Sequence, residues 1–281
     1  MPASNNLQPD LQQENVAATD SEPQRKEGIV PDATHDEAED EQITINLNLK
    51  ALADKGFITK FCENRGLIEQ YRAIKRKLLN NAFGPISSSL NRPNLIIVSS
   101  SNSGEGKTFT SINLAMSFAL EQDKTVLLVD SDVLRPSVSA RLGIDQHPGL
   151  IEFLSGEISS ASSIIHSTNI DKLKFIAAGK PHHLSTELLA SERMSSLVEE
   201  LATRYSDRIV IFDAPPLLGI NETHILANLV GQAVVVVEEG KTKADDVKAA
   251  VAQLKPELAI GYVMNKTSRS WGGQYGYYYS K

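Results

Sequence analysis

The sequence predicts a doubly wound α/β fold with a mostly parallel sheet, and three observations support this prediction. Continuous runs rich in valine, isoleucine and leucine recur over residues 95–264. Stretches with helical spacing of apolar residues separate these runs, which is the pattern of parallel strands covered on both faces. Hydrophobic residues make up 41% of the 281 residues, so the chain can bury a core of this kind.

The apolar runs give six expected strands, and amphipathic stretches between them give four expected helices. The strands are Leu95–Ser99, Thr125–Asp130, Leu173–Ala177, Arg208–Asp213, Gln232–Val237 and Ile260–Met264. The helices are Lys107–Leu120, Thr186–Arg204, Glu222–Leu229 and Ala244–Leu254. A further helix is expected over 66–80, where apolar residues again recur at helical spacing. Residues 43–267 are therefore expected to form one domain, with 43–61 as a short lead-in.

The first 42 residues differ in composition from the rest of the chain. Residues 1–41 contain eleven acidic and two basic residues, so this segment carries a charge of −9 in a chain of net charge −7. Such a segment cannot bury enough apolar surface to offset its ordering entropy, so we expect 1–42 to be disordered. The remaining residues carry a net charge of +2, and nothing in that balance calls for nucleic acid as a ligand.

The cysteine count and the hydropathy of the chain indicate the cellular compartment in which the protein is expected. The chain has one cysteine, Cys62, so an intramolecular disulfide is impossible, as suits a reducing compartment. Its start lacks the basic and apolar regions of a signal peptide, and its apolar runs are too short to cross a bilayer. We therefore expect a cytoplasmic protein that inserts no segment into the membrane and lies at the inner membrane through a partner.

A phosphate-binding loop is predicted where the first expected strand meets the helix after it. Residues 104–108 read Gly-Glu-Gly-Lys-Thr and match the end of the Walker A pattern. Small residues let backbone N–H groups turn toward phosphate, and the start of the helix adds its positive dipole end. Lys107 is expected at the β- and γ-phosphates of ATP, and Thr108 at Mg²⁺. Asn102 stands where partition-type and division-site ATPases carry an extra lysine, which argues against that subgroup.

Three carboxylates follow expected strands. Asp130 and Asp132 come at the end of Val-Leu-Leu-Val-Asp-Ser-Asp, and Asp213 ends Ile-Val-Ile-Phe-Asp. Ligands of open α/β sheets bind beyond such strand ends, and Mg·ATP needs carboxylate oxygens on its metal side. A single aspartate at a strand end can equally be a turn or capping residue. Three of them in a chain with a phosphate loop favour a catalytic site.

These motifs together resemble those of the bacterial tyrosine kinases, the P-loop autokinases of capsule and exopolysaccharide systems. Asp130-Ser-Asp132-Val-Leu-Arg135-Pro resembles the family's Walker A′ motif, and Ile-Phe-Asp213-Ala-Pro-Pro its Walker B motif. Glu69-Gln-Tyr-Arg72-Ala-Ile-Lys75 resembles its contact motif Glu-x-x-Arg-x-x-Arg. The residues that flank these motifs look similar to those of the exosortase-associated branch. The resemblance covers about residues 43–281 and implies a P-loop NTPase fold like that of partition and division ATPases.

The resemblance also implies roles for individual residues. The catalytic set is Lys107, Asp130, Asp132 and Asp213, with Asp130 as the candidate base. Thr108, Asp132 and Asp213 would support Mg²⁺, directly or through water. The expected ATP contacts are Ser103, Gly104, Glu105, Gly106, Lys107, Thr108, Phe109, Arg135 and Asn265. Glu69, Arg72 and Lys75 would form the contact between subunits of an oligomer such as a ring.

The last residues, 268–281, supply a candidate substrate. Tyr275, Tyr277, Tyr278 and Tyr279 lie in a glycine-bearing terminus, which we expect to be mobile enough to enter an active site. By resemblance they are the phosphoacceptors. The alternative is that they pack as aromatic anchors on the domain or on a partner.

The sequence therefore predicts an ATP-dependent tyrosine autokinase that phosphorylates its own tail in trans. By resemblance, its partner is a membrane chain-length-determining protein, a polysaccharide co-polymerase, and its process is exopolysaccharide synthesis and export. Two alternatives stay open: a partition-type ATPase switch that releases inorganic phosphate, and a scaffold that binds ATP without turnover. Asn102 and the tyrosine tail favour the kinase over the switch, and the intact lysine and aspartates favour it over the scaffold.

Overall fold

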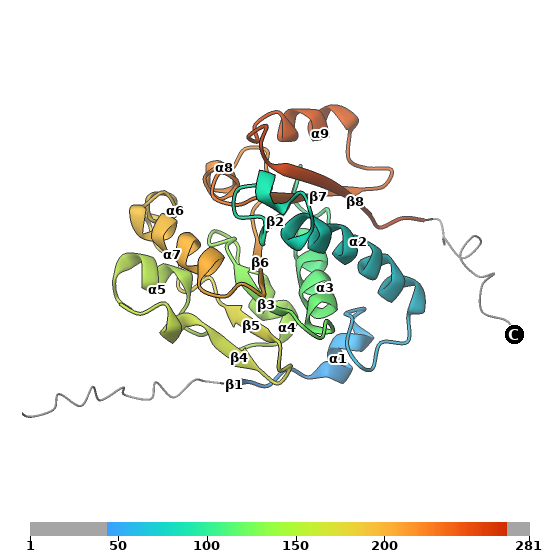
Figure 1. The fold of residues 1–281 in the computed structure, drawn as a ribbon, viewed down its shortest axis with the longest axis horizontal. Helices are drawn as coiled ribbons and strands as arrows, with labels where there is room; N and C mark the ends of the chain where they lie inside the picture. The colour runs from blue at the N-terminus through green and yellow to red at the C-terminus, as the bar shows by residue number, and fades with distance from the viewer. Residues whose placement is uncertain (1–43, 269–281) are drawn as a thin grey trace, which may run out of the picture. The chain divides into compact units, whose positions relative to one another are not determined.

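The computed structural model describes residues 44–268, and within them the chain forms one eight-stranded sheet (Figure 1). Its strands lie in the order β1-β4-β5-β3-β6-β2-β7-β8. They are β1 (Thr44–Ile45), β2 (Leu95–Ser100), β3 (Thr125–Asp130), β4 (His166–Thr168), β5 (Leu173–Ile176), β6 (Arg208–Asp213), β7 (Gln232–Glu238) and β8 (Ala259–Asn265). Neighbouring strands pair in parallel except for β4 and β5, which pair antiparallel. The expected doubly wound, mostly parallel sheet is confirmed.

Helices cover both faces of this sheet. They are α1 (Leu49–Asp54), α2 (Arg65–Phe83), α3 (Lys107–Ala119), α4 (Val138–Leu142), α5 (Leu150–Ser155), α6 (Ser185–Leu189), α7 (Glu192–Thr203), α8 (Asn221–Ala227) and α9 (Ala244–Val251). Buried side chains of α1 to α4 share one apolar cluster with the sheet, and those of α5 to α9 share the other. Two cores on opposite faces explain why the central strands β2 and β6 read as unbroken apolar runs and are buried throughout.

The structure refines the expected elements. All six predicted strands are present, but the helix predicted over 186–204 is divided into α6 and α7. The division falls at Ser191, whose side chain accepts a hydrogen bond from the Met194 N–H and caps α7. Five short elements were not predicted, because they are too short to show apolar periodicity: β1, β4, α1, α4 and α5.

The two ends of the chain lie outside the described residues. The predicted acidic segment 1–42 and the tyrosines at 275–279 belong to these ends. Within residues 44–268, no helix combines the length and apolar character needed to span a bilayer.

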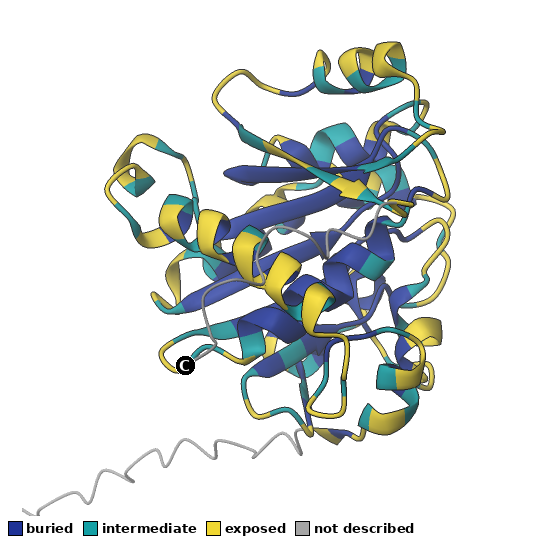
Figure 2. Cartoon of the chain, turned by 90° about the vertical axis from the view of Figure 1, so that its right-hand side faces the viewer, coloured by how far each residue is buried: buried dark blue, intermediate teal, exposed yellow. Residues whose placement is uncertain are grey.

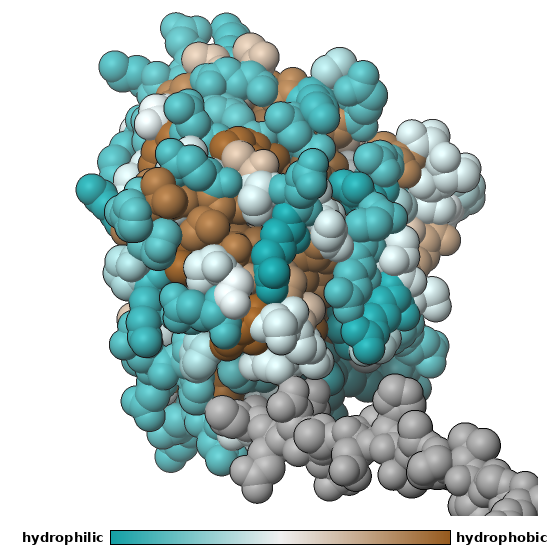
Figure 3. All heavy atoms as spheres, turned by 90° about the vertical axis from the view of Figure 1, so that its left-hand side faces the viewer, coloured by the Kyte–Doolittle hydropathy of each residue, from teal (hydrophilic) through white to brown (hydrophobic). Residues whose placement is uncertain are grey.

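Several large apolar side chains are exposed on the surface. Large exposed apolar side chains include Leu134 after β3, Leu184 before α6, and Tyr262 and Met264 on the edge strand β8. Figure 3 shows apolar side chains among hydrophilic ones on the side of the molecule that carries α5 and α6. The outer face of α2 is by contrast strongly exposed and polar (Figure 2).

Candidate active site

The phosphate loop connects the buried strand β2 to α3, as the sequence predicts. Two glycines make its turns. Gly104 has φ +86° and Gly106 has φ +103°, values that residues with a Cβ rarely adopt. Gly106 also lies so close to Asn265 that a Cβ would stand 1.9 Å from its Nδ2 atom. At Gly104 a Cβ would meet nothing within 4 Å, so the rim of the loop is open. This open, glycine-turned loop at a helix start is suited to holding a phosphate group.

Lys107 begins α3 and is paired with one of the predicted aspartates. Its Nζ atom lies 2.6 Å from Oδ2 of Asp132, and both residues are buried. Asp132 also accepts the Arg135 backbone N–H through Oδ1 at 3.1 Å, which holds the carboxylate in place after β3. The charge of the phosphate-loop lysine is thus paired with that of Asp132.

Thr108 lies in a second group of polar side chains centred on Asp213. The Thr108 hydroxyl donates to Asp213 Oδ2 at 2.8 Å, and the Ser111 hydroxyl donates to Asp213 Oδ1 at 2.8 Å. The Ser137 Oγ lies 2.9 Å from Thr108 Oγ1. Sequence reasoning missed both serines, although the position of Ser111, one helical turn after Lys107, was a signal that could have identified it.

Asp130 is the most deeply buried of the predicted catalytic aspartates, together with Asp213, its neighbour in the sheet. The strand register pairs these two residues across β3 and β6. Asp130 accepts the Val138 backbone N–H through Oδ2 at 3.0 Å, whereas Oδ1 has no hydrogen-bond partner among the described residues. Burial, reinforced by the charge of Asp213 and opposed by the Val138 N–H, raises the pKa of Asp130 to about 8. Burial also raises the pKa of Asp213.

The other predicted nucleotide contacts lie around the loop in different environments. Ser103 and Gly104 lie exposed on its rim. The Phe109 ring packs toward the core, 5.3 Å from the Phe57 ring between centroids. Arg135 has an exposed side chain. Asn265 comes from the end of β8 and donates through Nδ2 to the Glu105 carbonyl at 2.8 Å.

Glu105 differs from the predicted role. Its side chain is 2% exposed, and its two carboxylate oxygens accept the Asn102 backbone N–H and the Thr242 hydroxyl. The carboxylate therefore binds other parts of the protein, and the part of Glu105 left for a nucleotide is its backbone. Lys266, which sequence reasoning missed, reaches the same loop and donates to the Gly104 carbonyl at 2.8 Å.

The predicted contact helix is present as α2, but its three motif residues do not share one surface. Glu69 and Arg72 are exposed and form an ion pair with each other. Lys75 is buried instead, and its Nζ donates to the Ser117 carbonyl at 2.9 Å and pairs with Glu121. The structure therefore places Lys75 between α2 and the end of α3, inside the subunit. Arg76, the next residue, is exposed.

The donor set fits a nucleotide and a magnesium ion. Thr108 and Asp213 offer a hydroxyl and a carboxylate at the loop, which are ligand types that Mg²⁺ prefers. Lys107 offers the cation, and Asp130 Oδ1 is a buried carboxyl oxygen without a hydrogen-bond partner among the described residues. The site thus combines a loop suited to phosphate, a hydroxyl suited to a metal ion and three carboxylates, which are the groups that phosphoryl transfer needs.

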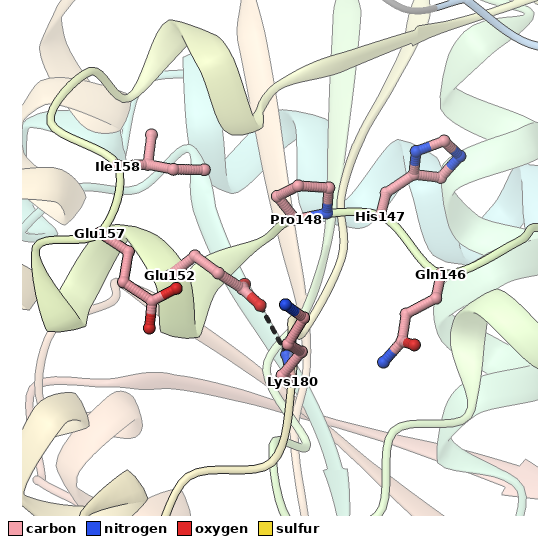
Figure 4. Close-up of a pocket in the computed structure, with 7 residues that line it drawn as sticks. All are labelled: Gln146, His147, Pro148, Glu152, Glu157, Ile158 and Lys180. Atoms are coloured by element: carbon pink, nitrogen blue, oxygen red, sulfur yellow. Dashed lines mark hydrogen bonds between the residues drawn. The ribbon is translucent and has the colours of Figure 1, made fainter.

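A separate pocket of about 390 Å³ lies beside α5 (Figure 4). It is lined by Gln146, His147, Pro148, Glu152, Glu157, Ile158 and Lys180. Glu152 holds its wall together, because its carboxylate accepts the backbone N–H groups of Gly149 at 2.8 Å and Lys180 at 2.9 Å. None of the predicted site residues lines this pocket.

Comparison with known proteins identifies relatives of this chain. The AAA domain family matches residues 94–249. The tyrosine-protein kinase YwqD of Bacillus subtilis is 33% identical over 216 residues, which cover 76% of this chain and 86% of YwqD. Three other curated tyrosine-protein kinases are much longer, and the chain spans only 21–25% of their length.

Two solved structures show the same fold. The VpsO kinase domain superposes with a TM-score of 0.61 at 26% identity, covering 74% of this chain and all of that domain. The cell division ATPase MinD of Pyrococcus furiosus superposes with a TM-score of 0.53 at 24% identity, covering 63% of this chain and 73% of MinD, and shares the fold alone. The sequence identity to YwqD over most of its length, with a phosphoryl-transfer site built as described, shows that this chain belongs to the family of bacterial tyrosine-protein kinases.

Proposed function

We propose that this kinase transfers the γ-phosphoryl group of Mg·ATP to tyrosines of its own C-terminal segment, from one subunit to another, and so regulates exopolysaccharide synthesis and export. One observation carries the proposal: Lys107, Thr108 and the three aspartates, which are far apart in sequence, meet at the ends of β2, β3 and β6. Tyr275, Tyr277, Tyr278 and Tyr279, the proposed acceptors, lie outside the described residues, as does the linker to them.

The geometry supports a task for each group. Lys107 would exchange Asp132 for a phosphate oxygen, and the N–H groups of the glycine-turned loop would face the same phosphates. Thr108 and Asp213 would hold the metal ion, whose charge offsets that of the transferred group when Mg·ATP is bound. Asp130, in its ionised form, would accept the tyrosine proton. Because Asp130 is covered, this role requires the segment after β3 to move when a tyrosine enters.

The test is to incubate the full chain with γ-labelled ATP and Mg²⁺ and to locate the label by mass spectrometry. We expect label on the four tail tyrosines, and none on the tail when all four are changed to phenylalanine. Phosphate released into solution with no label on the chain would instead support the partition-type switch, and nucleotide binding without either product would support the scaffold. The exosortase-associated branch stays a prediction.

We further propose that subunits contact one another through the exposed face of α2. Glu69, Arg72 and Arg76 lie on one side of this helix, since residues three and seven apart share a face. Arg76 takes the position that the sequence assigned to Lys75, because Lys75 is engaged with Glu121. A charged, solvated face is suited to a reversible contact between copies.

We expect Arg76→Glu to lower the oligomer mass measured by light scattering, because it reverses one charge of the proposed contact face. Lys77→Glu is the matched control: it changes charge equally on the same helix, but the residue lies on another face. The idea is wrong if both variants keep the mass of the unaltered protein, or if both lose it equally.

The membrane link is proposed from the family alone. A separate membrane protein of the chain-length-determining class would recruit the kinase to the inner membrane from the cytoplasm. If the isolated chain gives no label, the assay is repeated with the cytoplasmic segment of such a protein, and phosphorylation that appears only then would identify it as an activator.

A further inference from the structure

A buried carboxylate braces the phosphate loop from inside. Glu105 lies between the two turning glycines, and its Oε2 atom accepts the Asn102 backbone N–H at 3.1 Å. This bond spans the loop over three residues and fixes the orientation of one of its peptide groups. Because Glu105 is 2% exposed, little water competes for its oxygens, so each donor that they receive counts strongly.

The other carboxylate oxygen is held by a residue far away in the sequence. The Thr242 hydroxyl, in the turn between β7 and α9, donates to Glu105 Oε1 at 2.6 Å. The same hydroxyl accepts the Glu238 backbone N–H at 3.0 Å. Because that N–H must be the donor, the hydroxyl proton is directed to Glu105. The end of β7 thus fixes the orientation of the Thr242 hydroxyl, and this hydroxyl fixes the orientation of the Glu105 carboxylate.

Further contacts come to the loop from the same side. Asn102 Nδ2 donates to Asp246 in the first turn of α9 at 3.1 Å, and Asn265 Nδ2 donates to the Glu105 carbonyl at 2.8 Å. The loop is therefore bracketed by β7, α9 and β8, whereas its rim at Gly104 stays open. Such bracketing holds the loop in its binding shape before the nucleotide arrives.

We propose that Thr242 is a positioning residue for nucleotide binding, acting through Glu105 on the phosphate loop. This inference rests on the proposed function in taking Mg·nucleotide as the ligand of the loop. Without the Thr242 hydroxyl, Glu105 keeps a buried oxygen without its donor and the loop samples other shapes. Apparent affinity then falls in proportion to the fraction of molecules in the binding shape.

The test compares Thr242→Val, which removes the hydroxyl at constant shape, with Thr242→Ser, which retains it. Mg·ADP binding is measured by calorimetry on the full chain, and amide hydrogen exchange at Asn102 is followed without nucleotide. We expect Thr242→Val to weaken Mg·ADP binding about tenfold and to speed exchange at Asn102 by a similar factor, since a hydrogen bond to a charged group is lost. Thr242→Ser should restore both to near the unaltered values.

Thr203→Val is the control, because among the described residues the Thr203 hydroxyl bonds only within α7, to the Glu199 carbonyl at 2.8 Å. It should change neither measurement. Unaltered Mg·ADP affinity in Thr242→Val, or failure of Thr242→Ser to restore it, overturns the inference. If the unaltered chain binds Mg·ADP and Thr242→Val shows these shifts, but the unaltered chain labels no tyrosine, the proposed function fails while this inference stands.

Discussion

Lys107→Met is expected to reduce labelling of the tail tyrosines by about 10³-fold, because the buried cation at the phosphates is lost while the side-chain stem is kept. The same change should lower the free energy of unfolding of the nucleotide-free protein. It removes the partner of Asp132, which is 4% exposed, and breaking a buried ion pair from one side costs about 3 kcal/mol. Initial rates of labelling and urea unfolding measure the two effects.

The matched control is Lys248→Met, which makes the same substitution in an ion pair at the surface. Lys248 lies 3.4 Å from Asp245, and the two side chains are 79% and 92% exposed. We expect this variant to keep both labelling and stability, since exposed pairs contribute little. Labelling retained by Lys107→Met would remove the lysine from the mechanism and, with it, the proposed phosphate site.

The sequence predicted the central strands and the membership of the site, because both follow from local patterns. Asp130 and Asp213 each end an apolar run, and parallel strands bring such ends to one edge of the sheet. The Gly-Glu-Gly-Lys-Thr run similarly contains the information for its own turn. Here the local sequence and the three-dimensional arrangement agree, so the grouping of these residues could be predicted before any contact was known.

The rest depended on contacts between residues distant in sequence. No pattern shows that Lys75 is directed to Glu121 instead of to solvent, since charge and spacing are the same in both cases. The direction of the Glu105 carboxylate depends on Thr242, 137 residues later in the chain. Ser137 was missed because a serine after a proline is ordinary in a turn, and only the folded arrangement brings it to Thr108.

Burial of three carboxylates around one lysine also makes the site a source of pH dependence. Lys107 is paired with Asp132, which leaves Asp130 and Asp213 as neighbours at adjacent strand ends. Both have a raised pKa, chiefly through burial. The nucleotide-free enzyme is therefore expected to hold a proton here that the unfolded chain has released.

Asp130→Asn is accordingly expected to stabilise the nucleotide-free protein at pH 8 while reducing tyrosine labelling by about 10²–10⁴-fold through loss of the base. The pKa of Asp130 rises from 3.8 to about 8 on folding. Between these values the unfolded chain has lost the proton that the native protein keeps, so stability falls as pH rises and the loss is complete above about pH 8. A shift of this size corresponds to roughly 6 kcal/mol at most, and a neutral asparagine avoids that cost.

Urea unfolding at pH 5 to 8 tests the stability effect, with Asp245→Asn as control because its side chain is 92% exposed. We expect Asp130→Asn to flatten the fall in stability over this range without abolishing it, since Asp213 also has a raised pKa. An unchanged slope would mean that Asp130 is ionised in the folded protein. Stabilisation with labelling intact would mean that Asp130 is a buried structural acid. The base must then be sought at Asp132, the carboxylate that Lys107 would leave when it binds a phosphate oxygen.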